Sequence, residues 1–298
     1  MKIGLIIPLA EDDSTNTTPG YSFLRDYARQ AESIGLDSIW VFDHLLYRWP
    51  NKPDTYGIWE SWTLLTALAE ATQKVELGTL VLCVPFRNPA LLAKMATTLD
   101  EISNGRLILG LGAGWHQPEF EAFDYSFDHL ASRFDEALQI IVPLVRDGAV
   151  DFQGRYYSAN TCVIRPRGPR PNGPPILIAS SGPRMLALTA QYADQWNSAW
   201  FGQVESLAES RGKLGEACRS VGRDPATVAI TVGVNIAYPQ AGAEPPPARK
   251  ALSGSPEQIA TELQRYAEAG VAHVICNLDP ATPETLAEFG KAVGHVRR

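Results

Sequence analysis

The sequence has few cysteines and no long apolar run. Its four cysteines, Cys83, Cys162, Cys218 and Cys276, stand more than fifty residues apart. Without a CxxC pair or a Cys/His group, neither a zinc site nor a disulfide scaffold is expected, and the thiols should be free and buried. No stretch of about 18 apolar residues exists, and the N-terminus lacks the apolar segment of a signal peptide. We therefore expect a cytoplasmic protein without a membrane span.

Basic residues are outnumbered by acidic ones. The 26 lysines and arginines face 33 aspartates and glutamates, which gives a net charge of -7. A nucleic-acid backbone needs a basic surface, so nucleic acid is not expected as the main partner. Any phosphate site must be local, built from backbone amides or a few arginines.

The main positive signal is a regular alternation of apolar runs and helical segments. Near-continuous apolar runs are typical of strands buried on both faces of a parallel sheet. Eight such runs are Lys2–Leu9, Ser38–Asp43, Val75–Cys83, Arg106–Ala113, Pro175–Ser180, Asp194–Ala199, Val228–Ala237 and His273–Leu278. The helical segments between them are Ser22–Ile34, Trp59–Thr72, Pro89–Ile102, Arg133–Val145, Pro183–Tyr192, Val204–Val221, Pro256–Ala269 and Thr282–Val296.

Eight repeats favour a (β/α)8 TIM barrel over a doubly wound sheet. We expect residues 1–298 to form a single barrel domain, since this length matches such a barrel with insertions. The expected insertions are Leu45–Ile58 after the second strand, Val150–Pro174 before the fifth and Tyr238–Ser255 after the seventh. The first and third follow strand ends and are candidate lids. The second contains RPRGPR, which should approach the barrel from the opposite end.

Barrel enzymes place their chemistry where strands meet the following loops. Asp43 and His44 follow the second strand, where a histidine can act as a general acid or base and an aspartate can orient it. The alternative for His44 is a loop residue that caps the strand. Gly112 and Gly114, in LGLGAGW, allow a ring or a phosphate to approach the backbone, or allow tight barrel packing.

The segment Ser180-Ser181-Gly182-Pro183-Arg184 leaves the fifth strand and opens a helix. Helix N-termini bind phosphate through free N–H groups, so this turn is the best candidate for a cofactor phosphate; an ordinary serine N-cap is the alternative. Tryptophans near strand ends, Trp49, Trp59, Trp115 and Trp200, are candidates to wall a cofactor ring or an apolar substrate, whereas Trp40 and Trp196 lie within strands and should be packing residues.

Several blocks resemble the bacterial-luciferase-like superfamily of flavin- and deazaflavin-dependent oxidoreductases. The resemblance covers nearly the whole chain, through KIGLIIP, AESIGLDSIWVFDH, VELGTLVLCVPFRNPALLAKMATTLDEISNGRLILGLGAGW, EFEAFDYSFDHLASRFDEALQIIVPL and PILIASSGPRMLALTAQYADQWN. It implies a cofactor at the C-terminal ends of the strands and a non-proline cis peptide at Leu80-Val81. The GAGW and GPRMLALTAQYAD blocks look most like users of coenzyme F420, while FMN users share most of the other blocks.

The resemblance assigns roles to individual residues. His44, with Asp43, would serve as acid/base or ring contact, and the cofactor would be held by Leu80, Val81, Ala113, Gly114, Trp115, Ser180, Ser181, Gly182, Pro183, Arg184 and Trp200. Two departures stand out. Trp115 replaces the glutamate of the sugar-phosphate dehydrogenase branch, which disfavours that substrate, and Ser180-Ser181 replaces a common Gly-Gly turn.

Three functions remain open from the sequence. The first is F420-dependent hydride transfer on a small organic substrate. The second is a monooxygenase that inserts oxygen into an apolar substrate with reduced FMN from a separate reductase. The third is a barrel that has lost catalysis and only binds a ligand or a partner. A homodimer is the expected assembly, and no metal is expected.

Overall fold

A closed parallel barrel forms the centre of the computed structural model, which describes residues 1–12, 16–48, 54–242 and 250–297. Of the nine strands in its main sheet, eight form the ring and a pairing of β10 with β7 closes it. The ring strands are β1 (Lys2–Ile6), β2 (Ser38–Val41), β5 (Glu76–Thr79), β7 (Leu107–Gly112), β10 (Ile176–Ala179), β11 (Gln195–Phe201), β12 (Ala229–Ala237) and β13 (His273–Asp279). The predicted (β/α)8 barrel is confirmed.

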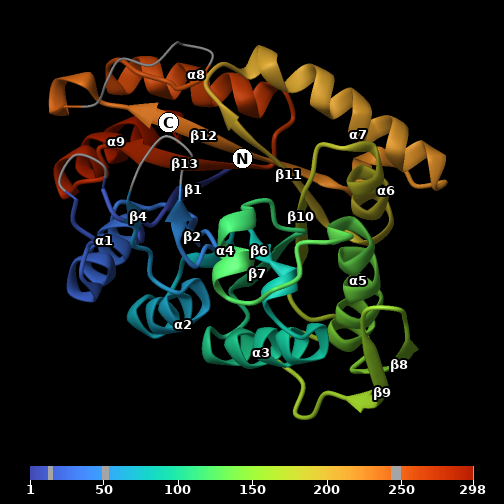
Figure 1. Ribbon diagram of the computed structural model, residues 1–298. Helices are drawn as coiled ribbons and strands as arrows, with labels where there is room; N and C mark the ends of the chain where they lie inside the picture. Colours follow the sequence, from blue (N-terminus) through green and yellow to red (C-terminus); the bar gives the residue numbers. More distant parts are fainter. Residues whose placement is uncertain (13–15, 49–53, 243–249, 298) are drawn as a thin grey trace.

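Helices surround the barrel, as Figure 1 shows. Each predicted helix is present, with bounds that differ by a few residues: α1 (Tyr21–Ser33), α2 (Ser61–Ala71), α3 (Pro89–Ile102), α5 (Leu130–Arg146), α6 (Pro183–Tyr192), α7 (Ala208–Ser220), α8 (Pro256–Glu268) and α9 (Pro283–Val296). Capping boxes at Ser255 and Thr282 fix the starts of α8 and α9. A further helix, α4 (Gln117–Ala122), is not predicted by the sequence pattern, because six residues are too few to show a helical period.

The three insertions lie where the sequence predicts them. After β2 the chain forms the short pair β3 (Tyr47–Arg48) and β4 (Thr55–Tyr56), and before β10 it forms the hairpin β8 (Ala149–Gln153) and β9 (Ser158–Val163). After β12 comes the 3-10 turn η4 (Pro239–Ala241); residues 49–53 and 243–249 of the two candidate lids lie outside the described residues. The remaining 3-10 turns are η1 (Val84–Phe86), η2 (Val204–Leu207) and η3 (Pro225–Thr227).

The arginine-rich segment approaches the barrel from the end opposite the candidate lids, as predicted. Arg170 donates hydrogen bonds to Asp100 at the end of α3 and to the carbonyl oxygen of Leu107, the first residue of β7. Its positive charge is therefore used to hold the N-terminal end of the barrel together.

The barrel interior is apolar in its middle. A layer of six buried side chains fills it: Ile6, Trp40, Leu80, Ile108, Leu177 and Ile275. Polar groups are also buried in the barrel. The hydroxyl of Ser38 lies 2.7 Å from Nε2 of His273 and accepts a hydrogen bond from Nε1 of Trp40. Burial lowers the pKa of His273 to about 3, so this ring is neutral. Trp40 and Trp196 are fully buried, which confirms their predicted packing role.

The third strand is interrupted, and this interruption shapes the mouth of the barrel. After β5 ends at Thr79, the chain bulges through Leu80 and Val81 and resumes pairing with β7 as β6 (Leu82–Cys83). Gly110 of β7 lies against this point, because a Cβ built on it would be 1.8 Å from the carbonyl oxygen of Thr79. The bulge thus depends on a close approach of two backbones that only glycine permits.

We predict that Gly110→Ala destabilises the protein by about 3 kcal/mol, since the added methyl group meets backbone that cannot rotate away. Urea denaturation measures the change. Gly212→Ala, on α7 with open space around the site, is the matched control and should stabilise by about 0.5–1 kcal/mol through helix propensity. Equal midpoints for the two variants would contradict the close approach.

Candidate active site

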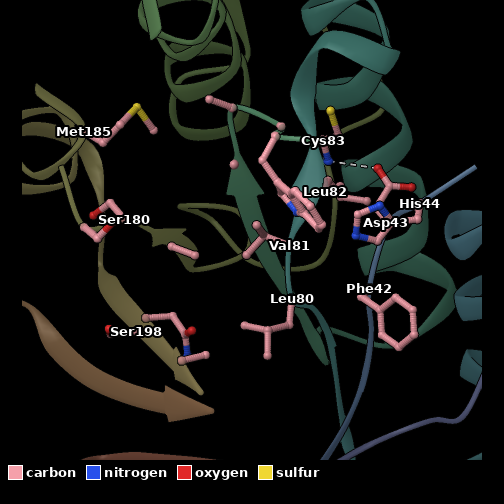
Figure 2. A pocket seen from close by; sticks show the side chains of 18 of the residues that line it. Phe42, Asp43, His44, Leu80, Val81, Leu82, Cys83, Ser180, Met185 and Ser198 are labelled. Atoms are coloured by element: carbon pink, nitrogen blue, oxygen red, sulfur yellow. Dashed lines mark hydrogen bonds between the residues drawn. The ribbon is translucent and has the colours of Figure 1, made fainter. Parts of the chain in front are cut away.

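A cavity of about 430 Å³ opens at the C-terminal ends of five neighbouring strands. We call it the ring cavity. Its lining includes ten of the thirteen residues predicted for the site: Asp43, His44, Leu80, Val81, Ala113, Gly114, Trp115, Ser180, Ser181 and Gly182. Figure 2 shows Asp43 and His44 on one side, Ser180 and Met185 on the other, and Val81 between them. The structure thus brings the candidate acid/base and the candidate phosphate turn to opposite ends of one space.

Three predicted cofactor residues do not line this cavity. Pro183 and Arg184 lie on the exposed first turn of α6, where Arg184 donates a 3.0 Å hydrogen bond to the hydroxyl of Ser132. Trp200 is 44% exposed, and its ring covers Gly233 of β12. Their roles in holding a cofactor stay predictions.

The floor of the ring cavity is the bulge after β5. The peptide bond Leu80-Val81 is cis, as the family resemblance implies, and so is Ala199-Trp200, which the sequence did not indicate. A Cβ on Gly112 would lie 2.6 Å from the Val81 side chain, and one on Gly114 would lie 2.6 Å from Sγ of Cys83. These two glycines therefore make room for the bulge, which supports the packing interpretation of LGLGAGW.

His44 is held by a carboxylate from a distant part of the chain. Its Nδ1 lies 2.6 Å from Oε1 of Glu119 on α4, and the other oxygen of Glu119 accepts a 2.6 Å hydrogen bond from the backbone N–H of Leu45. Glu119 is 2% exposed and His44 12% exposed. A proton on Nδ1 satisfies the buried carboxylate, so Nε2 of His44 is left as the basic atom.

Glu119 is absent from the residues that the sequence predicts for the site. It follows the fourth strand by seven residues, on a helix too short to be read from periodicity. The only local signal is Pro118-Glu119, six and seven residues after the strand end, a pattern that favours a helix start. A carboxylate thus reaches His44 even though Trp115 occupies the position where the sugar-phosphate dehydrogenase branch is expected to carry a glutamate.

Aromatic rings enclose His44 further. Trp115 makes an edge contact with it at 5.5 Å between ring centroids, and the rings of Tyr47 and His116 lie at 4.4 and 6.1 Å. His116 is buried, and burial lowers its pKa. Two other tryptophans are predicted to wall the site. Of these, Trp59 donates a hydrogen bond to the carbonyl oxygen of Pro19, and Trp49 lies outside the described residues.

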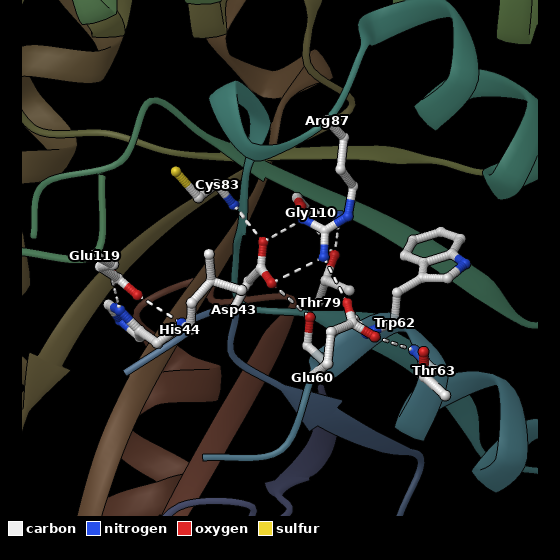
Figure 3. Close-up of polar contacts among 12 residues, drawn as sticks. Asp43, His44, Glu60, Trp62, Thr63, Thr79, Cys83, Arg87, Gly110 and Glu119 are labelled. Carbon is white, nitrogen blue, oxygen red and sulfur yellow. Dashed lines mark hydrogen bonds and ion pairs between the residues drawn. The ribbon is translucent and has the colours of Figure 1, made fainter. Parts of the chain in front are cut away.

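The expectation that Asp43 orients His44 is not met by a hydrogen bond between the two side chains, because the carboxylate of Asp43 has other partners. The carboxylate of Asp43 is 3% exposed and accepts hydrogen bonds from the hydroxyl of Ser61, the backbone N–H of Cys83 and both terminal nitrogens of Arg87, at 2.6–3.0 Å. Figure 3 shows this network, in which Arg87 also binds Glu60. Asp43 therefore ties the end of β2 to α2, β6 and the segment before α3, and acts on His44 only through the backbone.

The turn predicted for phosphate has free donors. Gly182 is the N-cap of α6 and gives no side-chain cap, and within the described part of the chain no backbone partner accepts from the N–H groups of Arg184 or Met185. No atom lies within 4 Å of a Cβ built on Gly182, so a ligand has access to the turn. The hydroxyl of Ser180 is engaged with Thr189, at 2.8 Å. Ser181, Gly182 and the first turn of α6 therefore fit an anion.

Comparison with known proteins points to one family. The sequence model described as luciferase-like monooxygenase matches residues 1–244. A pyrimidine monooxygenase RutA from Methylobacterium radiotolerans is 32% identical over 242 residues, which cover 72% of this chain and 61% of that protein. An F420-dependent glucose-6-phosphate dehydrogenase from Amycolatopsis mediterranei is 37% identical over 176 residues, 57% of this chain and 50% of that protein. The aligned part of the chain thus spans about half to three fifths of the length of these relatives.

Solved structures share the fold. An F420-dependent secondary alcohol dehydrogenase, solved with an F420-acetone adduct, superimposes with a TM-score of 0.80 at 21% identity and covers 100% of this chain and 99% of its own. A monooxygenase, RslO1 from Streptomyces bottropensis, gives a TM-score of 0.77 at 20% identity over 99% of each chain. At these identities the likeness concerns the fold alone. No helix within the described ranges is long and apolar enough to cross a membrane.

We predict that Arg87→Met lowers the free energy of unfolding by about 3 kcal/mol, because the buried Asp43 carboxylate loses its counter-charge. Chemical denaturation measures the loss. The double variant Asp43→Asn/Arg87→Met should recover part of it, since the unpaired charge is gone. Arg25→Met, which breaks an exposed pair with Asp26, is the control and should change stability by less than about 0.5 kcal/mol. If Arg87→Met were as stable as the control Arg25→Met, the anchoring role of Asp43 would be refuted.

Proposed function

Because this chain belongs to the luciferase-like monooxygenase family, we propose that it is an oxidoreductase that uses coenzyme F420 for hydride transfer on a small organic substrate. The observation that carries the proposal is the His44–Glu119 pair beside the ring cavity. When the substrate is an alcohol or a carbonyl compound, a hydride moved at the carbon must be matched by a proton moved at the oxygen. A histidine with its Nδ1 proton fixed by a carboxylate is suited to that task.

The residues of the ring cavity fit such a cofactor. Its volume lies within the range of about 300–1,000 Å³ that is usual for small-molecule sites. Leu80, Val81 and Ala113 would support the ring, and the turn at Ser181-Gly182 with the first turn of α6 would hold the phosphate. When bound, the deazaflavin supplies or accepts the hydride, and the protein supplies position and proton transfer.

Each protein group has a defined part in the proton step. Nε2 of His44 would take a proton from a substrate hydroxyl, or return it to a substrate carbonyl. Glu119 would keep the other proton on Nδ1 and stabilise the imidazolium that forms. Asp43 is a positioning residue, because its bonds to Cys83 and Arg87 fix the backbone that carries His44.

An FMN-dependent monooxygenase is the second candidate, and the apolar wall of the same cavity favours it. Phe42, Leu80, Val81, Leu82 and Met185 line the space and would exclude water from a reactive flavin. The RutA relative is named a pyrimidine monooxygenase. In this version a separate reductase would supply reduced FMN.

The cellular setting is part of the proposal. All four cysteines are free, and three are buried, as suits a reducing compartment; we therefore place the protein in the cytoplasm. We also take residues 1–298 as one domain and a homodimer as the working unit, as expected from the sequence.

Titration of the purified protein with coenzyme F420 and with FMN, followed by absorbance, tests the cofactor. We expect saturable binding of F420 with a stronger affinity than that of FMN. Tight FMN binding without F420 binding, together with oxygen consumption, would select the monooxygenase. If neither cofactor binds, both proposed enzyme activities are rejected, and the barrel would be one that only binds some other ligand.

We predict that His44→Asn lowers kcat by about 10²–10⁴-fold while cofactor affinity changes little, because the asparagine cannot carry the proton. Glu119→Gln should cause a smaller loss of kcat, since the glutamine no longer stabilises the imidazolium. Stopped-flow kinetics on cofactor-loaded protein measures both. Unchanged turnover in His44→Asn would remove this residue from the reaction.

A further inference from the structure

A second, larger cavity of about 960 Å³ lies beside the ring cavity at the C-terminal ends of β1, β12 and β13. We call it the amide cavity. Phe42, at the end of β2, lines both spaces, so the two cavities meet at this ring. Apolar walls of the amide cavity come from Ile6, Pro8, Phe23 and Ile236. A substrate held here would lie next to a cofactor held in the ring cavity.

Two asparagines at matching positions of neighbouring strands give the amide cavity its polar character. Asn235 of β12 is paired in register with Asn277 of β13, and Nδ2 of Asn277 donates to Oδ1 of Asn235 at 3.2 Å. Nδ2 of Asn235 in turn donates to the carbonyl oxygen of Lys250, also at 3.2 Å. A carbonyl oxygen can only accept, so it fixes the direction of the whole chain of bonds.

With the hydrogen bonds in this direction, Asn277 keeps one acceptor and one donor hydrogen available. Within the described residues its Oδ1 has no hydrogen-bond partner, and one of its two Nδ2 hydrogens is not used by Asn235. The side chain is half-buried and lines the cavity. It therefore offers one acceptor and one donor on a single plane, an arrangement that complements the C=O and N–H of another amide.

The charges around the amide cavity are mainly negative. Among the residues that the structure describes, its lining contains the carboxylates of Glu11, Asp12 and Asp279 and the ammonium group of Lys250. Glu11 accepts a hydrogen bond from the backbone N–H of Gly57 at 2.7 Å. Burial, together with the nearby charge of Asp12, raises the pKa of Asp279. A phosphate or carboxylate would meet repulsion here, whereas an uncharged polar group would not.

We propose that the amide cavity is the substrate site of the enzyme and that it selects an uncharged carboxamide, lactam or cyclic imide through Asn277. The assignment rests on the proposed function, since it takes the ring cavity for the cofactor. Asn277 recognises the amide group, the apolar walls contact the body of the substrate, and the carboxylates exclude anions. The reacting group of the substrate would extend past Phe42 into the ring cavity, where His44 lies. Sugar phosphates are excluded on the same ground.

Three probes that share one ring test the selection: benzamide, benzoate and benzylamine. Ligand-observed NMR measures their affinities for the F420-loaded protein and, separately, for the cofactor-free protein. We expect benzamide to bind at least about tenfold more tightly than benzoate, the effect of roughly one satisfied hydrogen bond. Equal or tighter binding of benzoate, or no binding of benzamide, would overturn the proposal.

Variants assign the effect to the cavity. Asn277→Leu should weaken benzamide about tenfold and leave benzylamine unchanged, while Asp279→Asn should strengthen benzoate. Asn277→Asp keeps the size of the side chain and should weaken the binding of benzamide relative to benzylamine, because the new carboxylate attracts the ammonium group and cannot donate to an amide. This variant keeps the test decisive if the leucine variant fails to fold. Asn172→Leu, an exposed asparagine outside the cavity lining, is the control.

The two proposals fail in different ways. If the proposed function is wrong, the wild-type protein will bind neither F420 nor FMN. The affinities of the probes for the cofactor-free protein would still test the amide cavity. Benzamide affinity that is identical in Asn277→Leu and in the control would refute the amide cavity alone.

Discussion

The buried ion pair between Asp43 and Arg87 is the constraint on which the mouth of the barrel depends. Asp43 is the second residue after β2, and its carboxylate holds Ser61 at the start of α2, the backbone of Cys83 in β6 and the guanidinium of Arg87. Three segments that are separate in sequence, the end of β2, the start of α2 and the stretch from β6 to Arg87, therefore meet at one charge. Leaving a buried charge without its partner costs several kcal/mol of stability, so these segments cannot separate without destabilising the protein.

The groups proposed to carry the reaction depend on that ion pair. His44 comes directly after Asp43, so its backbone is fixed on one side by the ion pair and on the other by the bond from Leu45 to Glu119. The same anchor holds β6, and with it the bulge at Leu80 and Val81 that floors the ring cavity. The proposed acid/base group and the proposed cofactor floor are thus held by one network, while the turn proposed for the phosphate, Ser181-Gly182, is held independently by β10 and α6.

Much of the fold could be predicted from the sequence, because strands buried on both faces carry apolar runs such as Arg106–Ala113. Strand ends then pointed to His44 and to the Ser181-Gly182 turn, since barrel chemistry lies there. The partner of His44 could not be predicted, because Glu119 is 75 residues away on a helix of six residues. The direction of the Asp43 side chain depends on Arg87, which no local pattern connects to it.

The central claim is that one cavity holds a redox ring against Nε2 of His44. A crystal structure of the protein with coenzyme F420 tests it most directly. The account predicts the ring over Val81 within hydrogen-bonding reach of His44, and the phosphate at Ser181-Gly182. A cofactor ring bound in the amide cavity beside Asn277, or a phosphate away from the start of α6, would contradict it.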